Sequence, residues 1–211
     1  MPNGPWFVLV AGSNGAGKST FAQSPATLAA MVDDARLSEL QVINPDEVTR
    51  ALLAVRPSLT TDEANLEAAR WTEARVRALI AKPTVSFAIE TVLGSDKYKP
   101  IVELATTAGW RFLFVYVALP SVDEAVKRVR WRAAHGGHDV PEDKIRKRWH
   151  VSLANFPWFW RRSTSALLFL NPPAFAEPQL VARKPTSAPT EVLRPHADCR
   201  AALSALETVL G

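Results

Sequence analysis

At 211 residues the chain is long enough for one α/β domain with a real core, and its 47% hydrophobic and 22% charged content is typical of a soluble globular protein. The first apolar run is too short for a signal peptide or a membrane span, and a single cysteine excludes a disulfide framework and a cysteine-rich metal site. The net charge is only +4, yet residues 127–162 hold ten lysines and arginines against three acids. These features predict a cytoplasmic protein with no membrane partner and a phosphate-rich ligand.

Taken in chain order, apolar runs alternate with amphipathic segments. The runs predict strands at 6–12, 40–44, 85–90, 110–119 and 166–170. Because they are apolar on both faces, they are typical of central strands in a parallel sheet covered by helices. The predicted helices span 62–82, 101–109, 122–134 and 142–155. This alternation indicates a doubly wound α/β fold with a mostly parallel central sheet.

The remaining segment is rich in proline. Residues 172–195 contain six prolines, which predicts a loop with one edge strand, QLVARK, before a terminal helix at 197–209. We therefore expect a single domain over 1–211, with its core in residues 6–170 and a basic helical lid in about 125–149.

The motif with the clearest chemistry is GSNGAGKST, which directly follows the first predicted strand. It satisfies the phosphate-loop pattern G-x-x-x-x-G-K-[ST], in which backbone N–H groups surround phosphates and the lysine reaches their oxygens. Ser19 is the expected Mg²⁺ ligand, and the nucleotide is ATP or GTP. The predicted nucleotide-binding residues of this loop are Gly12, Ser13, Asn14, Gly15, Ala16, Gly17, Lys18, Ser19 and Thr20.

A phosphate loop alone does not specify where the phosphoryl group goes. A GTPase would need a guanine-reading N-K-x-D, which is absent, and the chain is short for an AAA+ or ABC-type motor. No acidic pair follows a strand as a hydrolase would require. The acids at strand ends are Asp46, in VINPDEVTR, and Glu90, in AIETVLGS. Strand ends in a parallel sheet meet at one edge, so both should lie near the phosphates.

Asp46 is the predicted catalytic base, because phosphoryl transfer to an alcohol needs a group that orients the hydroxyl and accepts its proton. The alternative is an ordinary helix N-cap, since Asn-Pro precedes it. Glu90 could bind substrate hydroxyls, assist Mg²⁺ through water or pair with an arginine. Thr91 and Ser95 are lesser substrate-binding candidates, and an N-cap is the alternative for Ser95.

Cations to cover the phosphates are expected from AVKRVRWRAAHGGHDVPEDKIRKRW, residues 125–149. Two basic helices flank a Gly-Gly turn, which is typical of a lid that closes over a nucleotide. Arg128 and Arg132 share a helix face and are assigned to catalysis, with Arg148 on the nucleotide and His138 on the substrate. Most of the other lysines and arginines are expected to be solvated.

Several of these motifs together resemble the zeta-toxin family of P-loop kinases. The resemblance covers about residues 6–170 and is carried by GSNGAGKST, INPDEVTR, ETVLGS, LFVYVAL, AVKRVRWR and GGHDVPEDKIRKRW. It implies an adenylate-kinase-like three-layer α/β/α fold that uses ATP and Mg²⁺. It also implies phosphorylation of a hydroxyl of UDP-N-acetylglucosamine, with Lys18 and Ser19 on ATP and metal, Asp46 as base, and Glu90 and Thr91 lining the substrate site. A small helical antitoxin would be a partner.

Two segments depart from the family pattern. After the fifth strand, LNPPAF keeps only Asn171 of an Asp-Asn-Ser-like turn. The cluster NFPWFW, residues 155–160, is unusually aromatic; core packing between the lid helix and the sheet is the favoured interpretation, and a docking surface the alternative.

Three function classes stay open at this level. The favoured one is a small-molecule kinase acting on a sugar nucleotide. The second is a P-loop switch or hydrolase without a dedicated acceptor. The third is a polynucleotide kinase or nucleic-acid-binding protein using the basic stretch, which the Gly-Gly turn between the basic helices disfavours.

Overall fold

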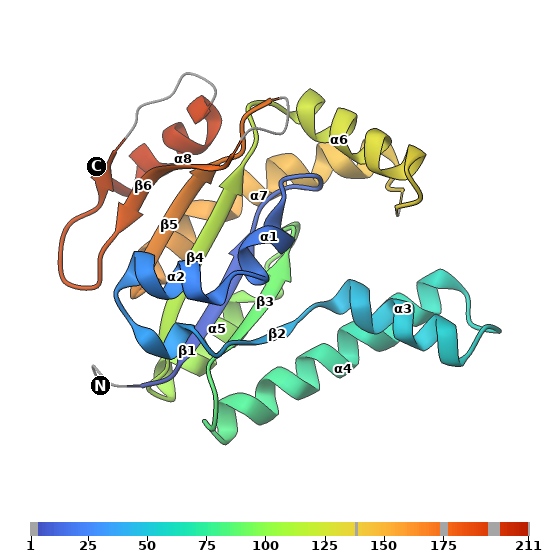
Figure 1. The fold of residues 1–211 in the computed structure, drawn as a ribbon, viewed down its shortest axis with the longest axis horizontal. Coiled ribbons are helices and arrows are strands. Elements are labelled where there is room, and N and C mark those ends of the chain that lie inside the picture. Colours follow the sequence, from blue (N-terminus) through green and yellow to red (C-terminus); the bar gives the residue numbers. More distant parts are fainter. Residues whose placement is uncertain (1–3, 138, 174–176, 194–198, 211) are drawn as a thin grey trace.

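The computed structural model describes residues 4–137, 139–173, 177–193 and 199–210. A seven-stranded sheet in the order β2-β3-β1-β4-β5-β6-β7 forms its centre (Figure 1). The pairs from β2 to β5 are parallel, and β6 and β7 are antiparallel to their neighbours. The strands are β1 (Trp6–Ala11), β2 (Gln41–Ile43), β3 (Phe87–Thr91), β4 (Arg111–Ala118), β5 (Ser165–Leu170), β6 (Gln179–Lys184) and β7 (Glu191–Val192).

Helices cover both faces of the sheet, so the predicted three-layer α/β/α arrangement is confirmed (Figure 1). They are α1 (Lys18–Ala22), α2 (Pro25–Val32), α3 (Pro45–Val55), α4 (Thr61–Ala81), α5 (Lys99–Thr107), α6 (Val122–Ala134), α7 (Glu142–Arg162) and α8 (Arg200–Leu210), with a 3-10 helix η1 (Ala35–Leu37). One core packs α1, α2 and α6 on the sheet, and the other packs α4, α5 and α8. Helix α7 contributes to both cores.

The apolar runs of the sequence form strands that helices cover on both faces, as expected. Every residue of β1 and β5 is buried, as central strands require. The run at 40–44 is an exception, because β2 is an edge strand in which Val42 is exposed. The prediction that QLVARK is an edge strand was also wrong: the two-residue β7 pairs with its outer side.

Side-chain caps account for some of the helix starts. Thr60 and Glu63 form a capping box at α4, and the Ser121 side chain accepts the Glu124 N–H at the start of α6. Helix α7 runs seven residues beyond the predicted end at 155 and contains Pro157. Residues 197 and 198 of the predicted terminal helix lie outside the described residues.

The extension of α7 explains the aromatic cluster. Phe156, Phe159 and Trp160 are fully buried, and Phe159 stacks on Phe114 of β4 with ring centroids 5.6 Å apart. Core packing against the sheet is therefore correct for NFPWFW. Among the residues described, no helix combines the length and apolar character that crossing a membrane demands.

Candidate active site

The phosphate loop connects β1 to α1 at the carboxyl edge of the sheet. Gly17 caps α1 with a φ of +86°, a conformation that glycine adopts without strain. A β-carbon at Gly17 would lie 2.7 Å from the Asn171 amide nitrogen, so a side chain there would have to displace that amide. That amide donates to the Ala16 carbonyl at 2.9 Å. Asn171 is the one residue that LNPPAF keeps of the Asp-Asn-Ser-like turn. Its side chain thus holds the phosphate loop in place from the end of β5.

Lys18 is the cation at the centre of the loop. Its ammonium donates to the Ser13 carbonyl at 3.0 Å. Burial lowers its pKa to about 8, while Glu90 and Asp46 oppose this lowering and Arg132 and Arg148 add to it. Two carboxylates and two guanidinium groups therefore lie close enough to act on one ammonium. The structure brings together these five predicted residues, which come from five separate elements of the fold.

Ser19 and Glu90 are in direct contact. The Ser19 hydroxyl donates to Glu90 Oε2 at 3.0 Å, and the Asn44 amide approaches Glu90 Oε1 at 3.4 Å. Burial raises the pKa of Glu90 despite the Ser19 hydrogen bond and the Lys18 charge, which lower it. A hydroxyl beside a carboxylate is an oxygen donor set that fits Mg²⁺, directly or through water. The assignment of Ser19 and Glu90 to a metal fits this geometry.

Asp46 lies in the first turn of α3 and is exposed. It does not cap the helix: the Asn44 side chain occupies that position and accepts the Asp46 backbone N–H at 3.0 Å. The N-cap alternative for Asp46 was therefore wrong, because the preceding asparagine satisfies the orphan N–H. The Asp46 carboxylate is left beside Lys18 and Glu90, whose pKa values its charge raises.

Arg148 of α7 is held next to the loop that follows β3. A β-carbon on Gly94 would lie 3.1 Å from Arg148 Cγ, so the glycine of ETVLGS allows α7 to approach. The two motifs carry no sequence signal of this contact, because it is tertiary. Arg132 is exposed near the end of α6, within electrostatic reach of Lys18.

Arg128 is buried and bound by protein groups, whereas Arg132 is exposed. Its side chain is only 6% exposed, its Nε donates to Glu124 at 2.9 Å, and its Nη2 donates to the Pro172 carbonyl. Its β-carbon lies 3.0 Å from where a Gly15 β-carbon would be. Arg128 therefore fastens α6 next to the phosphate loop, and its assignment to catalysis stays a prediction.

Other lid cations connect the two lid helices. Arg146 of α7 contacts Asp123 of α6 at 2.7 Å and Glu142 at 2.8 Å, and Arg130 contacts Glu142 at 2.5 Å. Lys127, Lys144 and Lys147 are exposed, as expected for solvated charges. Part of the basic stretch is therefore used to join the lid helices to each other.

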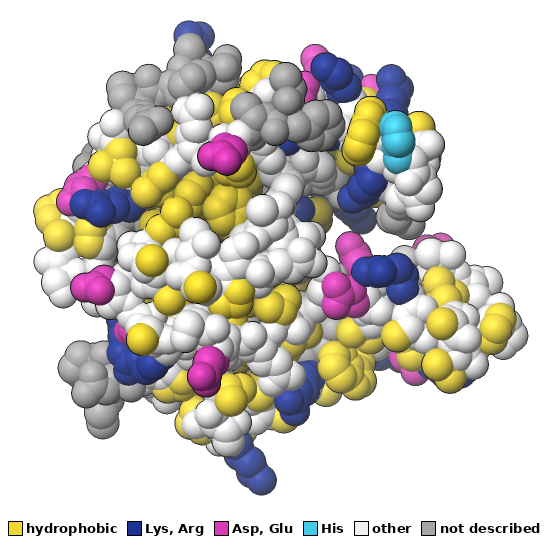
Figure 2. All heavy atoms as spheres, viewed as in Figure 1, with side chains coloured by type: hydrophobic (Ala, Val, Ile, Leu, Met, Phe, Trp, Pro, Cys, Tyr) yellow, Lys and Arg dark blue, Asp and Glu magenta, His cyan; other side chains and the backbone are white. Residues whose placement is uncertain are grey.

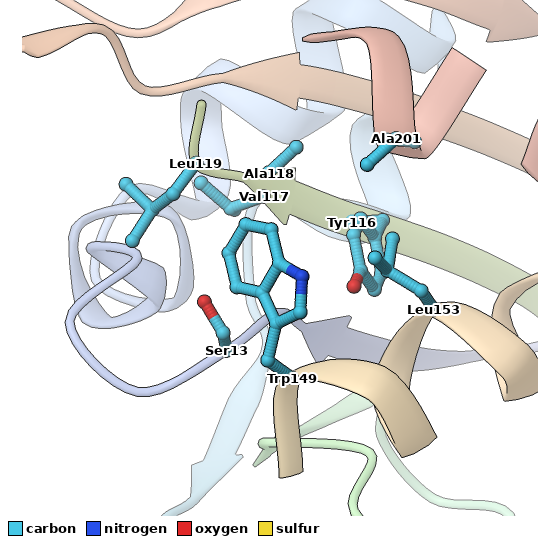
Figure 3. A pocket seen from close by; sticks show the side chains of 9 residues that line it. Ser13, Tyr116, Val117, Ala118, Leu119, Trp149, Leu153 and Ala201 are labelled. Atoms are coloured by element: carbon cyan, nitrogen blue, oxygen red, sulfur yellow. The ribbon is translucent and has the colours of Figure 1, made fainter. Parts of the chain in front are cut away.

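Two residues of the phosphate loop have buried polar atoms without hydrogen-bond partners. Ser13 is buried in a tight crevice beside Trp149 of α7 and Tyr116 of β4, and its hydroxyl has no hydrogen-bond partner there (Figure 3). The Asn14 amide oxygen is also without a partner. Such buried unpaired atoms mark a loop that is incompletely satisfied by protein alone.

Two further candidates lie after β3. Thr91 is buried and its hydroxyl accepts the Leu93 N–H at 3.0 Å, which shapes the turn. Ser95 is exposed and is not an N-cap, since α5 begins after Tyr98 without a side-chain cap. His138, a predicted substrate contact, lies outside the described residues.

The surface is hollowed between the lobe of α6 and the arm formed by α3 and α4. Figure 2 shows acidic and basic side chains on the rim of this notch, and Figure 1 places the phosphate loop at its inner end. A parallel sheet with a phosphate loop, a carboxylate and cations at its carboxyl edge defines a P-loop protein with a kinase-like fold.

The comparisons with known proteins agree with that class. Residues 7–157 match the AAA domain family (AAA_33), and the chain belongs to this family of P-loop, kinase-like domains. A search of the curated proteins found no match.

Solved structures share the fold at low sequence identity. A chain of the AvrRxo1-ORF1:-ORF2 complex with ATP is 15% identical with a TM-score of 0.71, covering 98% of this chain and 63% of that one. This chain thus spans just under two thirds of that protein's length. The PezAT toxin-antitoxin system of Streptococcus pneumoniae matches at 15% identity and a TM-score of 0.57, covering 80% and 68% of the two chains. A putative kinase from Chloroflexus aurantiacus matches at 19% identity and a TM-score of 0.53, covering 69% and 76%.

Proposed function

We propose that the protein transfers the γ-phosphoryl group of ATP to a hydroxyl of a small molecule. The observation that carries this proposal is the position of Asp46, an exposed carboxylate in the same electrostatic cluster as Lys18 and Glu90. A hydrolase has no acceptor hydroxyl to orient. A kinase needs a carboxylate that orients the attacking hydroxyl and accepts its proton.

The other residues then have distinct roles. The backbone N–H groups of the loop and the Lys18 ammonium bind the β- and γ-phosphates, and Arg132 and Arg148 offset charge on the transferring group. Ser19 and Glu90 would hold Mg²⁺, which offsets phosphate charge when bound. Glu90 and Thr91 line the acceptor side. Arg128 serves as a positioning residue, since its guanidinium is held by Glu124 and Pro172.

The acceptor that we favour is a sugar nucleotide such as UDP-N-acetylglucosamine, on the zeta-toxin-like motifs of the sequence. The similarity to a toxin-antitoxin structure supports a small helical protein as a partner. The need for ATP supports a cytoplasmic location, and similarity to a complex solved with ATP supports ATP over GTP. Nucleic acid is disfavoured because Arg130 and Arg146 are paired within the lid.

A transfer assay tests this function. The wild type is incubated with γ-labelled ATP, Mg²⁺ and either UDP-N-acetylglucosamine, other sugar nucleotides or a metabolite extract, and labelled products are identified by mass. We expect a phosphorylated acceptor with the wild type and none with Lys18→Ala. Release of inorganic phosphate alone, unchanged by every acceptor, would favour a hydrolase and overturn the proposal.

A further inference from the structure

Leu93 has an unusual backbone conformation in the loop that follows β3. Its φ is +55°, in the left-handed region that residues with bulky side chains rarely adopt, because the β-carbon comes too close to a carbonyl oxygen there. The Leu93 side chain is fully buried in the core that α4, α5 and α8 cover. Strained turns of this kind persist only where the surrounding structure holds them, and they cluster at functional sites.

Two hydrogen bonds hold this turn. The Thr91 hydroxyl accepts the Leu93 N–H at 3.0 Å from within the loop. The side-chain amide of Asn155, in α7, donates to the Leu93 carbonyl at 3.2 Å. Asn155 is only 6% exposed and belongs to the aromatic segment NFPWFW. Core packing accounts for its aromatic neighbours but not for a buried amide, which is costly unless it makes hydrogen bonds.

The same helix carries Arg148. Asn155 follows Arg148 by seven residues, which is about two helical turns, so the two side chains lie on the same side of α7. Both meet the loop after β3. Asn155 binds the Leu93 carbonyl, and a β-carbon on the next residue, Gly94, would lie 3.1 Å from Arg148 Cγ. The turn at Leu93 therefore sets how closely the Gly94 backbone approaches the stem of Arg148.

The Arg148 stem leads toward the phosphate loop. Burial is the main cause of the lowered pKa of Lys18, and the Arg148 charge adds to it, so the guanidinium lies within electrostatic reach of that lysine. An arginine side chain loses conformational freedom when it is fixed in one direction. Packing of its stem before a ligand arrives reduces that cost at the moment of binding. A backbone that fits beneath the stem thus prepares the guanidinium for a bound nucleotide.

We propose that Asn155 is a positioning residue for Arg148. Its amide holds the strained turn at Leu93, and the turn keeps Gly94 against the Arg148 stem, so that the guanidinium points to the nucleotide phosphates. The inference rests on the part of the proposed function in which Arg148 binds the nucleotide, and it does not depend on the acceptor.

The test measures the affinity of the non-hydrolysable ATP analogue AMP-PNP, with Mg²⁺, by calorimetric titration alongside thermal melts. Asn155→Leu keeps the size of the side chain and removes the amide donor. We expect it to weaken AMP-PNP binding by roughly three- to tenfold, the effect of one hydrogen bond. In the Arg148→Gln background the same change should alter the affinity by less than about twofold, because the cation that Asn155 positions is already gone.

Ser152→Ala is the matched control. Ser152 precedes Asn155 in α7, is fully buried, and its hydroxyl lies 2.9 Å from the Tyr116 hydroxyl of β4. This variant also removes one buried hydrogen bond from α7, but the partner is Tyr116 rather than the turn at Leu93. It should lower the melting temperature about as much as Asn155→Leu and keep the AMP-PNP affinity within about twofold of the wild type. Equal losses of affinity in the two variants would make Asn155 merely structural and overturn the proposal.

Gly94→Val tests the same link from the loop and leaves the Asn155 hydrogen bond in place. Its side chain has to push against the Arg148 stem, so AMP-PNP binding should weaken to a similar extent as in Asn155→Leu. This variant decides the question if Asn155→Leu does not fold. Wild-type affinity in Gly94→Val, or additive losses when the Asn155 and Arg148 changes are combined, would contradict the positioning role.

The outcomes separate this inference from the proposed function. AMP-PNP binding that depends jointly on Asn155 and Arg148, in a protein that phosphorylates no acceptor, would support the positioning role and remove the kinase. Phosphorylation of an acceptor by a protein in which the two losses are additive would leave the kinase intact and remove the positioning role.

Discussion

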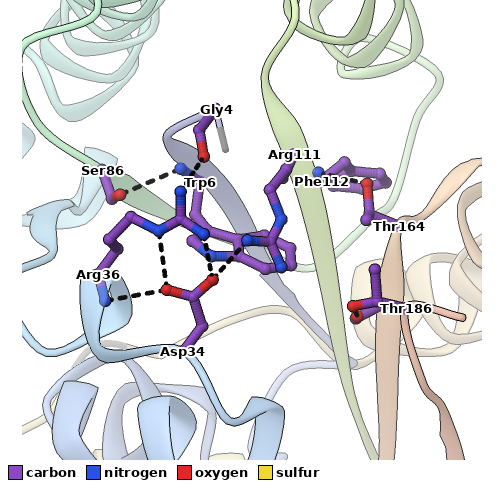
Figure 4. A network of polar contacts seen from close by, with 10 residues as sticks. Gly4, Trp6, Asp34, Arg36, Ser86, Arg111, Phe112, Thr164 and Thr186 are labelled. Atoms are coloured by element: carbon purple, nitrogen blue, oxygen red, sulfur yellow. Dashed lines mark hydrogen bonds and ion pairs between the residues drawn. The ribbon is translucent and has the colours of Figure 1, made fainter. Parts of the chain in front are cut away.

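Two clusters of charged side chains lie at opposite edges of the sheet, and their charges are handled differently. At the amino edge, Asp34 accepts hydrogen bonds from Arg36 Nε at 2.9 Å and Nη2 at 2.7 Å and pairs with Arg111 (Figure 4). The Arg111 guanidinium lies 3.8 Å above the Trp6 ring. The Arg36 hydrogen bonds are the main reason that the pKa of Asp34 lies well below its usual range.

At the carboxyl edge the pKa shifts disfavour the charged forms, whereas the shift of Asp34 favours its charged form. Burial lowers the pKa of Lys18 and raises that of Glu90, so both groups are less stable in their charged forms than in water. Paired charges complete a structure, whereas incompletely compensated ones indicate a site whose remaining charge partners are ligands. By this criterion the cluster around Asp34 is structural and the cluster around Lys18 is functional, although both contain carboxylates and basic side chains.

The largest expected effect is at the carboxyl edge. Lys18→Met should reduce phosphoryl transfer by roughly 10³-fold, because it removes the cation on the transferring phosphoryl group. It should not lower the melting temperature, since it relieves the burial of a charge. Initial rates and thermal melts of the same preparations check this, and a destabilised but active variant would place Lys18 in the structural class.

Asp34→Asn should have the converse profile. It removes a charged partner of Arg111, which is only 11% exposed, and should lower the free energy of unfolding by about 1–3 kcal/mol. Because the pKa of Asp34 is lowered, the stabilisation is present above about pH 4 and is lost as the pH falls further. Urea denaturation at pH 7 measures it, with the exposed neighbour Asp33→Asn as control. Equal stability of the two variants would contradict a structural amino edge.

The lid cations provide a finer test. Arg148→Gln should reduce transfer by roughly 10- to 100-fold, because it removes one of the charges near the phosphates. Lys147→Gln makes a similar charge change on an exposed residue of the same helix and should remain within about twofold of the wild type. Steady-state kinetics of both variants measure this difference. Equal impairment of the two variants would contradict the assignment of Arg148 to the phosphates.

The smallest effect concerns pH. Below about pH 8 the Lys18 ammonium is charged before nucleotide arrives; above it, binding must restore the proton, because bound phosphates raise the pKa of Lys18. Nucleotide affinity should therefore fall by up to about tenfold per pH unit above 8. Calorimetric titration of AMP-PNP from pH 7 to 9.5 measures this decline. In Lys18→Arg the profile should be flat, and an equally steep decline there would exclude Lys18 as its cause.

Much of the fold could be predicted because its signals are local. The central strands are continuous apolar runs, and the phosphate loop is a contiguous motif bounded by β1 and α1. The convergence of Asp46 and Glu90 near Lys18 was also predictable, since parallel strands end at one edge. The assignment of an edge position to β2 was missed because a short apolar run does not reveal how many neighbours a strand has.

The features of the site that could not be predicted depend on tertiary contacts between residues far apart in the sequence. Helical spacing placed Arg128 and Arg132 on one face, but the burial of Arg128 against Glu124 and Pro172 depends on a segment over 40 residues away. The close approach of Gly94 and Arg148 likewise joins distant parts of the chain. Asn44 was visible in the sequence only as a turn residue, although it both caps α3 and approaches Glu90.

The most direct test of the central claim is the transfer rate of Asp46→Asn, compared with Glu47→Gln, which neutralises the adjacent exposed carboxylate. Asp46→Asn should reduce kcat for acceptor phosphorylation by about 10²–10⁴-fold and leave AMP-PNP affinity within a few-fold of the wild type. Glu47→Gln should retain most of the activity. An Asp46→Asn variant that transfers phosphate at nearly the wild-type rate would contradict the role of Asp46 as the base of a kinase.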